Sequence, residues 1–196
     1  FCHLYIGEEA VAVGSIAALN LAKDYVVTAY RDHGHALACG MTSRSVMAEL
    51  YGKITGCSKG KGGSMHMFDA QRHMLGGNGI VGSQIPVATG VALKIAYREE
   101  KGVVLCSFGD GAIHQGAFHE SLNMAKIWNL PIVYICENNH YGMGTDFRRV
   151  SAVTDFTVMG ASYGIEGSQV NGSAIAPTAI KTAFTRPSGC KRFIQA

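Results

Sequence analysis

The chain of 196 residues lacks three features that would place it in a special class. No apolar run approaches the roughly 18 residues that cross a bilayer, so no membrane segment or membrane partner is predicted. The net charge is only +3, and no dense basic patch is interleaved with aromatic residues, which argues against a nucleic-acid partner. No two cysteines form a C-x-x-C pair, so neither zinc nor a disulfide framework is expected, and a reducing compartment is favoured.

A hydrophobic fraction of 47% is enough for one substantial core, which predicts a single domain or a large part of one. The 25 glycines fall near turns and motif loops rather than in a low-complexity tract, so disorder is not implied. Because the chain begins with Phe1 rather than Met, we expect the natural N-terminus and any targeting peptide to lie outside it.

Two apolar runs end in polar residues that suit a metal and a phosphate. Residues 103–108 lead into the string GDG around Asp110, and residues 131–136 lead into the string ENN, which ends at Asn139. A carboxylate and an amide oxygen are hard ligands for Mg²⁺, which also takes phosphate oxygens and water. Gly111 lets a phosphate approach the backbone and offers its N–H as a donor. The pattern predicts a metal-diphosphate site built from two strand ends.

The segment between these runs has the pattern of a helix. Residues 116–129 place four apolar side chains on one face, at Phe118, Leu122, Ala125 and Trp128. Strand, glycine-rich turn, helix and strand predict a right-handed parallel unit with its ligand-bearing loops at the carboxyl ends of the strands. The predicted fold class is therefore α/β, with a mostly parallel central sheet flanked by helices. In a simpler interpretation, Asp110 only caps the helix and the asparagines only form a turn. Both motifs together favour the site.

Other local patterns predict further elements. Residues 8–20 are Ala-rich and predict a short helix, and residues 25–29 predict a strand. Thr42 is a plausible N-cap for a third segment, and Pro86 suits the first turn of a helix. Beyond about residue 171 the sequence shows no clean periodicity.

Two glycine-rich strings imitate nucleotide-binding motifs. Residues 77–82 match G-x-G-x-x-G, but residues 71–75 before them lack the pattern of a hydrophobic strand, and Pro86 places the helix late. Residues 56–61 resemble a P-loop but have too few residues between the glycines, and Gly62 replaces the Ser or Thr that would hold Mg²⁺. Neither string is expected to bind a nucleotide, and the second is predicted to be a loop.

Several strings occur in an order typical of one family. GDG followed by NN resembles the signature of thiamine-diphosphate enzymes. With FCHLY at the start, TAYR ending at Arg31, GKGGSMHM, GNGIVG and ENNHYGMGT, the chain is similar to the α subunit of the pyruvate dehydrogenase component of the 2-oxo acid dehydrogenase complexes. The similarity covers residues 1–172, which we interpret as a partial thiamine-diphosphate-binding domain. Residues 173–196 are predicted to be a divergent C-terminal tail of uncertain structure.

The resemblance implies a metal and a cofactor. Mg²⁺ would be held by Asp110, Asn139 and the backbone carbonyl of Tyr141. Gly111 and Ala112 would lie along the diphosphate of thiamine diphosphate.

It also implies the rest of the site. Arg31 would bind a phosphate, a task that suits the planar guanidinium. Tyr30, Gly79 and Val81 would line the cofactor, and His3 would face the substrate as a catalytic residue.

The implied activity is the oxidative decarboxylation of pyruvate with transfer of the acetyl group to a lipoyl group of the acetyltransferase component. The implied assembly is an α2β2 heterotetramer in which the β subunit supplies the glutamate that activates the cofactor. The implied location is the cytoplasm in a bacterium and the mitochondrial matrix in a eukaryote. Two alternatives remain open: the α subunit of acetoin dehydrogenase, and a truncated fragment that packs against a partner without turnover.

Overall fold

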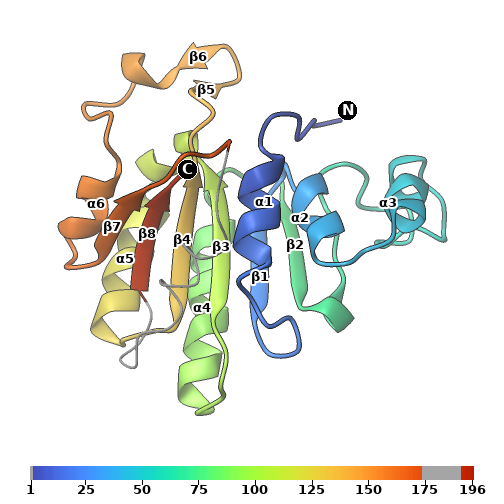
Figure 1. Ribbon diagram of the computed structural model, residues 1–196, viewed down its shortest axis with the longest axis horizontal. Coiled ribbons are helices and arrows are strands. Elements are labelled where there is room, and N and C mark those ends of the chain that lie inside the picture. The colour runs from blue at the N-terminus through green and yellow to red at the C-terminus, as the bar shows by residue number, and fades with distance from the viewer. Residues whose placement is uncertain (1, 174–190) are drawn as a thin grey trace.

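The computed structural model describes residues 2–173 and 191–196. Within these residues the chain forms a parallel six-stranded sheet in the order β2-β1-β3-β4-β8-β7. A short antiparallel hairpin, β5 to β6, lies beyond the carboxyl ends of the central strands (Figure 1). The strands are β1 (Tyr25–Ala29), β2 (Met74–Asn78), β3 (Val104–Gly109), β4 (Ile132–Glu137), β5 (Tyr141–Gly142), β6 (Thr145–Asp146), β7 (Glu166–Gln169) and β8 (Lys191–Gln195).

Helices cover both faces of the sheet. In Figure 1, α1 lies in front of the sheet, whereas α4 and α5 lie behind it. The described helices are α1 (Glu9–Ile16), α2 (His33–Ala38), α3 (Ser43–Leu50), α4 (Gln84–Tyr97), α5 (Gly116–Ile127) and α6 (Thr157–Ala161). None of them is long and apolar enough to span a membrane.

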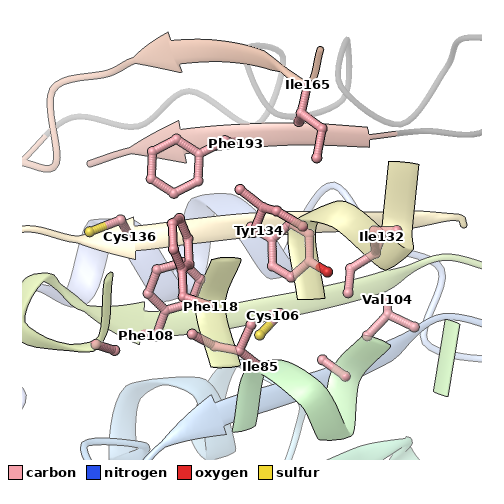
Figure 2. Close-up of a cluster of buried hydrophobic side chains, with 14 of the residues drawn as sticks. Ile85, Val104, Cys106, Phe108, Phe118, Ile132, Tyr134, Cys136, Ile165 and Phe193 are labelled. Carbon is pink, nitrogen blue, oxygen red and sulfur yellow. The ribbon is translucent and has the colours of Figure 1, made fainter. Parts of the chain in front are cut away.

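Adjacent residues of the central strands enter two different cores. Val26 belongs to the core beneath α1, and Val27 belongs to the core beneath α4 and α5. On β4, Val133 and Tyr134 divide in the same way. The core beneath α4 and α5 contains the aromatic side chains drawn in Figure 2. Burial on both faces explains why these strands are continuously apolar rather than alternating.

The structure confirms most of the predicted elements. The two apolar runs form β3 and β4, which are adjacent and parallel, and α5 connects them. Thr42 caps α3, since its Oγ1 accepts a hydrogen bond from the Ser45 N–H over 3.2 Å. Pro86 lies in the first turn of α4. The helix predicted for residues 8–20 is shorter, because only Glu9–Ile16 is helical.

Two expectations differ from the structure. The pattern predicts that Trp128 shares the apolar face of the helix, but it follows the last residue of α5 and its exposed fraction is 47%. Residues 71–75 lack the pattern of a hydrophobic strand, yet Met74–Asn78 forms β2, because pairing with β1 overrides its low hydrophobicity. In the C-terminal segment, whose structure the sequence left open, Lys191–Gln195 forms β8, which pairs with both β4 and β7. Residues 174–190 lie outside the described part of the chain.

Candidate functional site

The two polar strand ends lie next to each other. Gly109, the last residue of β3, is paired with Glu137, the last residue of β4. Asp110 follows the first strand directly, and Asn139 follows the second by two residues. The carboxyl ends of parallel strands are the usual position for a ligand in an open α/β sheet. The predicted convergence of these two loops is therefore present.

A cavity of about 530 Å³ lies at these strand ends. Its walls contain every residue nominated from the sequence except Gly79. These wall residues are His3, Tyr30, Arg31, Val81, Asp110, Gly111, Ala112, Asn139 and Tyr141. We call this space the strand-end cavity.

Gly79 lies outside the walls of the strand-end cavity. A Cβ atom at this position would be 3.0 Å from Cε1 of His66, so the residue packs closely against that ring. Its contact with a cofactor therefore stays a prediction.

The backbone around Asp110 leaves room for a ligand. A Cβ atom added at Gly109 or Gly111 would meet no heavy atom within 4 Å. Burial raises the pKa of Asp110, although His140 and His114 act in the opposite direction. A divalent cation beside this carboxylate would favour its charged form.

Both the nitrogen and the oxygen of the Asn139 side-chain amide make hydrogen bonds. Its Nδ2 donates to Oε1 of Glu8 over 2.9 Å, and its Oδ1 accepts from the Tyr141 N–H over 3.2 Å. A carbonyl oxygen has two lone pairs, so the same Oδ1 retains an acceptor site for a metal. The pKa of Glu8 is raised mainly by burial and further by the nearby charge of Glu137.

The N-terminal segment and the loop after β1 form another wall of the cavity. The His3 ring lies beside the Tyr30 ring, with centroids 4.4 Å apart. Arg31 donates through Nη1 to the Leu4 carbonyl oxygen, and its Nε lies 3.8 Å from Oε2 of Glu8. Burial and the charge of Arg31 lower the pKa of His3, which favours a neutral imidazole at neutral pH.

Gln84 is a cavity residue that the sequence analysis missed. It is the first residue of α4, and its exposed fraction is 1%. Neither Oε1 nor Nε2 has a hydrogen-bond partner within the described residues. A buried amide without partners costs free energy unless a ligand or water satisfies it. No sequence signal marked this residue, because its position depends on how α4 meets β3.

Glu137 and Ser107 also line the cavity, although no role was predicted for either residue. Burial alone would raise the pKa of Glu137. The nearby His35 ring and the hydrogen bonds from Ser107 and Tyr5 instead hold this pKa below its ordinary value. Glu137 stands in the string ENN, so its place beside the site was visible in the sequence, but its partners were not.

Few side chains at the site could coordinate a metal ion. Within the described residues, no group of three or more His, Cys, Asp and Glu side chains is arranged to hold a metal ion. Asp110 and Asn139 provide only one carboxylate and one amide oxygen, so phosphate oxygens and water would complete the shell of Mg²⁺. With the open backbone at Gly111 and the unpaired Gln84 amide, the cavity fits a phosphorylated organic cofactor with its cation.

The loop whose sequence resembles a P-loop already binds an anion of the protein itself, the carboxylate of Glu49. The carboxylate of Glu49 is buried, and it accepts four backbone N–H bonds of 2.7 to 3.0 Å from the loop. The donors are Ser58, Gly60, Gly62 and Gly63. These groups therefore have no capacity left for a nucleotide phosphate. This geometry agrees with the prediction that the string is a structural loop.

Two solved structures resemble this fold. A protein from Mycobacterium smegmatis described as thiamin diphosphate-dependent superimposes with a TM-score of 0.64, at 16% identity, over 98% of this chain and 33% of its own. Transketolase from Campylobacter jejuni gives 0.71, at 13% identity, over 96% of this chain and 37% of its own. The chain therefore has the fold of the thiamine-diphosphate-dependent enzymes.

Sequence similarity identifies the family to which the chain belongs. The family model "Dehydrogenase E1 component" matches residues 1–187, and the chain belongs to this family. It is 57% identical over 183 residues to the pyruvate dehydrogenase E1 component subunit alpha of Rhizobium meliloti, covering 93% of this chain and 52% of the relative. The Zymomonas mobilis protein of the same name is 51% identical, with 88% and 49% covered. The chain thus spans about half the length of these relatives.

Proposed function

We propose that this chain binds thiamine diphosphate and Mg²⁺ in the strand-end cavity, as part of an enzyme that decarboxylates pyruvate and transfers the acetyl group to a lipoyl group. One observation carries the proposal: the cavity joins Asp110, Asn139 and the other nominated residues apart from Gly79. The names of the relatives support pyruvate, rather than acetoin, as the substrate.

The anchoring residues hold the charged end of the cofactor. Asp110, the Asn139 Oδ1 and the Tyr141 carbonyl would coordinate Mg²⁺, with phosphate oxygens in the same shell. The backbone at Gly111 and Ala112 would lie along the diphosphate. Arg31 would donate to a phosphate, since its guanidinium is already held at the cavity by Leu4.

The remaining wall residues act near the reacting carbon. When bound, thiamine diphosphate supplies the carbanion chemistry that releases carbon dioxide from a 2-oxo acid. Tyr30 and Val81 would exclude water from the ring of the cofactor. A ring nitrogen of His3, neutral at pH 7 because its pKa is lowered, would accept or donate a proton beside the substrate.

The active assembly would need further chains. A β subunit would complete an α2β2 heterotetramer and supply the glutamate that activates the cofactor, since no glutamate of this chain is assigned that role. The acetyl group would pass to the lipoyl group of an acetyltransferase component. We therefore expect the 196-residue chain alone to be inactive.

Replacing Asp110 by Ala tests the proposal. In the full-length protein assembled with its β subunit, the Asp110→Ala variant should lose Mg²⁺-dependent binding of thiamine diphosphate, because a charged ligand of the cation is removed. The Asn139→Ala variant should weaken binding in the same direction. Isothermal titration calorimetry measures both affinities.

A matched control removes a carboxylate outside the cavity. Glu120 is exposed on α5, so the Glu120→Gln variant should bind the cofactor as the wild type does. Unchanged affinity in the Asp110→Ala variant would remove the metal site from this loop.

A further inference from the structure

Glu137 is the centre of a buried group of polar contacts beside the strand-end cavity. Tyr5 Oη donates to Oε2 of Glu137 over 3.1 Å, and Ser107 Oγ donates to Oε1. His35 Nε2 lies 3.0 Å from the same Oε1. All four side chains are buried. We call these four residues the Glu137 cluster.

The Glu137 cluster joins the N-terminal segment to the loop after β1. Tyr5 lies two residues after His3, and His35 lies four residues after Arg31 in the first turn of α2. The Tyr5 and His35 rings meet edge to face, with centroids 5.2 Å apart. A Cβ atom at Gly34 would overlap the Tyr5 ring, so these two segments approach closely. The positions of His3 and Arg31 therefore depend on the same contacts.

The Glu137 cluster also joins the two strand ends. Ser107 lies on β3 three residues before Asp110, and Glu137 lies on β4 two residues before Asn139. The Ser107 hydroxyl bonded to the Glu137 carboxylate ties these strands together through their side chains, in addition to the ladder of the sheet. Four segments that carry nominated site residues thus converge on one carboxylate.

Stability alone does not require a carboxylate at this position. A buried charge costs free energy unless it is well paired, and an apolar side chain of similar size usually costs less. The preceding residues of β4, Ile135 and Cys136, are apolar and fully buried. Oε1 of Glu137 faces both Ser107 Oγ and His35 Nε2, and Oε2 accepts from Tyr5 Oη, so most of the acceptor capacity of this carboxylate is already used within the protein. Buried hydrogen bonds such as those from Tyr5 and Ser107 favour one geometry of the groups that they join.

We propose that Glu137 is a positioning residue, whose contacts with Tyr5, His35 and Ser107 hold the four site-bearing segments in the arrangement that binds the cofactor. The inference rests on the proposed function of the strand-end cavity. It predicts that Glu137 and Tyr5 affect cofactor affinity although neither residue contacts the metal.

Two conservative variants test the Glu137 cluster in the full-length protein assembled with its β subunit. Tyr5→Phe removes only a hydroxyl, and Glu137→Gln keeps the shape of the side chain but removes its charge. Each should raise the Kd of thiamine diphosphate at saturating Mg²⁺ by about tenfold, the effect of losing one buried hydrogen bond. The double variant should raise it by less than the product of the two single effects, because both changes remove the same contact. The apparent KM for the cofactor should rise more than kcat falls.

Tyr134→Phe provides the matched control. Tyr134 is also fully buried, and its hydroxyl lies 2.8 Å from Oγ1 of Thr89, in the core beneath α4 and outside the strand-end cavity. This variant should lower the thermal midpoint about as much as Tyr5→Phe and leave the Kd unchanged.

The outcomes separate the inference from the function on which it rests. If Tyr5→Phe and Glu137→Gln lower the thermal midpoint but leave the Kd unchanged, the cluster only stabilises the fold and the inference is wrong. If Glu137→Gln does not assemble, the result with Tyr5→Phe decides. If the wild type binds no thiamine diphosphate, the proposed function is wrong and the positioning role is overturned with it.

Discussion

Two glycine-rich loops of this protein present backbone N–H groups in different ways. In the loop of residues 58–63, the donors surround the carboxylate of Glu49. At Gly109 and Gly111, the space beside the backbone is open and belongs to the strand-end cavity. One loop binds an anion from its own chain, whereas the other is free to receive one from solution.

The comparison shows that glycine content does not distinguish a structural loop from a ligand site. Residues without side chains let an anion approach the backbone closely, as the Glu49 carboxylate does in the first loop and as we propose for the diphosphate in the second. The difference lies in whether a buried carboxylate of the protein already satisfies the donors. Glu49 comes from α3, and only the folded chain places it inside the loop.

Removing the internal anion should have the largest effect. The Glu49→Ala variant leaves four backbone N–H groups without their acceptor, and we expect a loss of at least about 3 kcal/mol in the free energy of unfolding. Denaturant unfolding of the assembled full-length protein measures it. A loss below about 1 kcal/mol would show that water replaces the carboxylate and that the loop does not depend on Glu49.

A pair of glycine substitutions sharpens the comparison. In the Gly62→Ala variant the new Cβ would overlap the His66 carbonyl oxygen, so the thermal midpoint should fall. In the Gly111→Ala variant the new Cβ meets no protein atom within 4 Å, so the midpoint without cofactor should stay the same. The affinity of this second variant for thiamine diphosphate should fall about tenfold, because the methyl group occupies space next to the diphosphate. Equal stability losses in the two variants would contradict the proposed difference between the loops.

The stabilisation by Glu49 should also depend on pH. Burial opposes ionisation, but the backbone N–H groups lower the pKa of Glu49 below its ordinary value of 4.5. A carboxylate whose pKa is lower in the folded state stabilises the fold above its ordinary pKa, and this contribution is lost as the pH falls through the folded value. The difference in thermal midpoint between the wild type and Glu49→Gln should therefore be larger at pH 7 than at about pH 3. A constant difference would show that charge is not the cause.

The smallest effect should come from the cap of the helix that carries Glu49. Thr42→Ala removes one hydrogen bond at the start of α3, which typically costs about 1 kcal/mol. The free energy of unfolding should fall by this amount, with no change in the affinity for thiamine diphosphate. A loss of cofactor binding in this variant would mean that the loop around Glu49 is coupled to the strand-end cavity.

Local patterns were sufficient to predict the centre of the fold. The apolar runs before Asp110 and Asn139 became adjacent parallel strands, and the helical pattern between them became α5. Such patterns predict strands and helices because each element carries its own run or period of apolar residues. The family strings and the two strand ends together nominated half of the residues that line the cavity, including His3 and Arg31.

Contacts between distant segments were not predictable in this way. Tyr5 and Glu137 are 132 positions apart, and β8 reaches its place in the sheet only by pairing with β4 and β7. Gln84 and Glu8 line the cavity without any pattern of their own. The sequence by itself determined which strands end in the residues proposed to bind a metal and a diphosphate, because that information is contained in short runs. Only the tertiary structure decided which buried carboxylates face a loop or join the site-bearing segments, because hydrogen bonds depend on atoms that folding brings together.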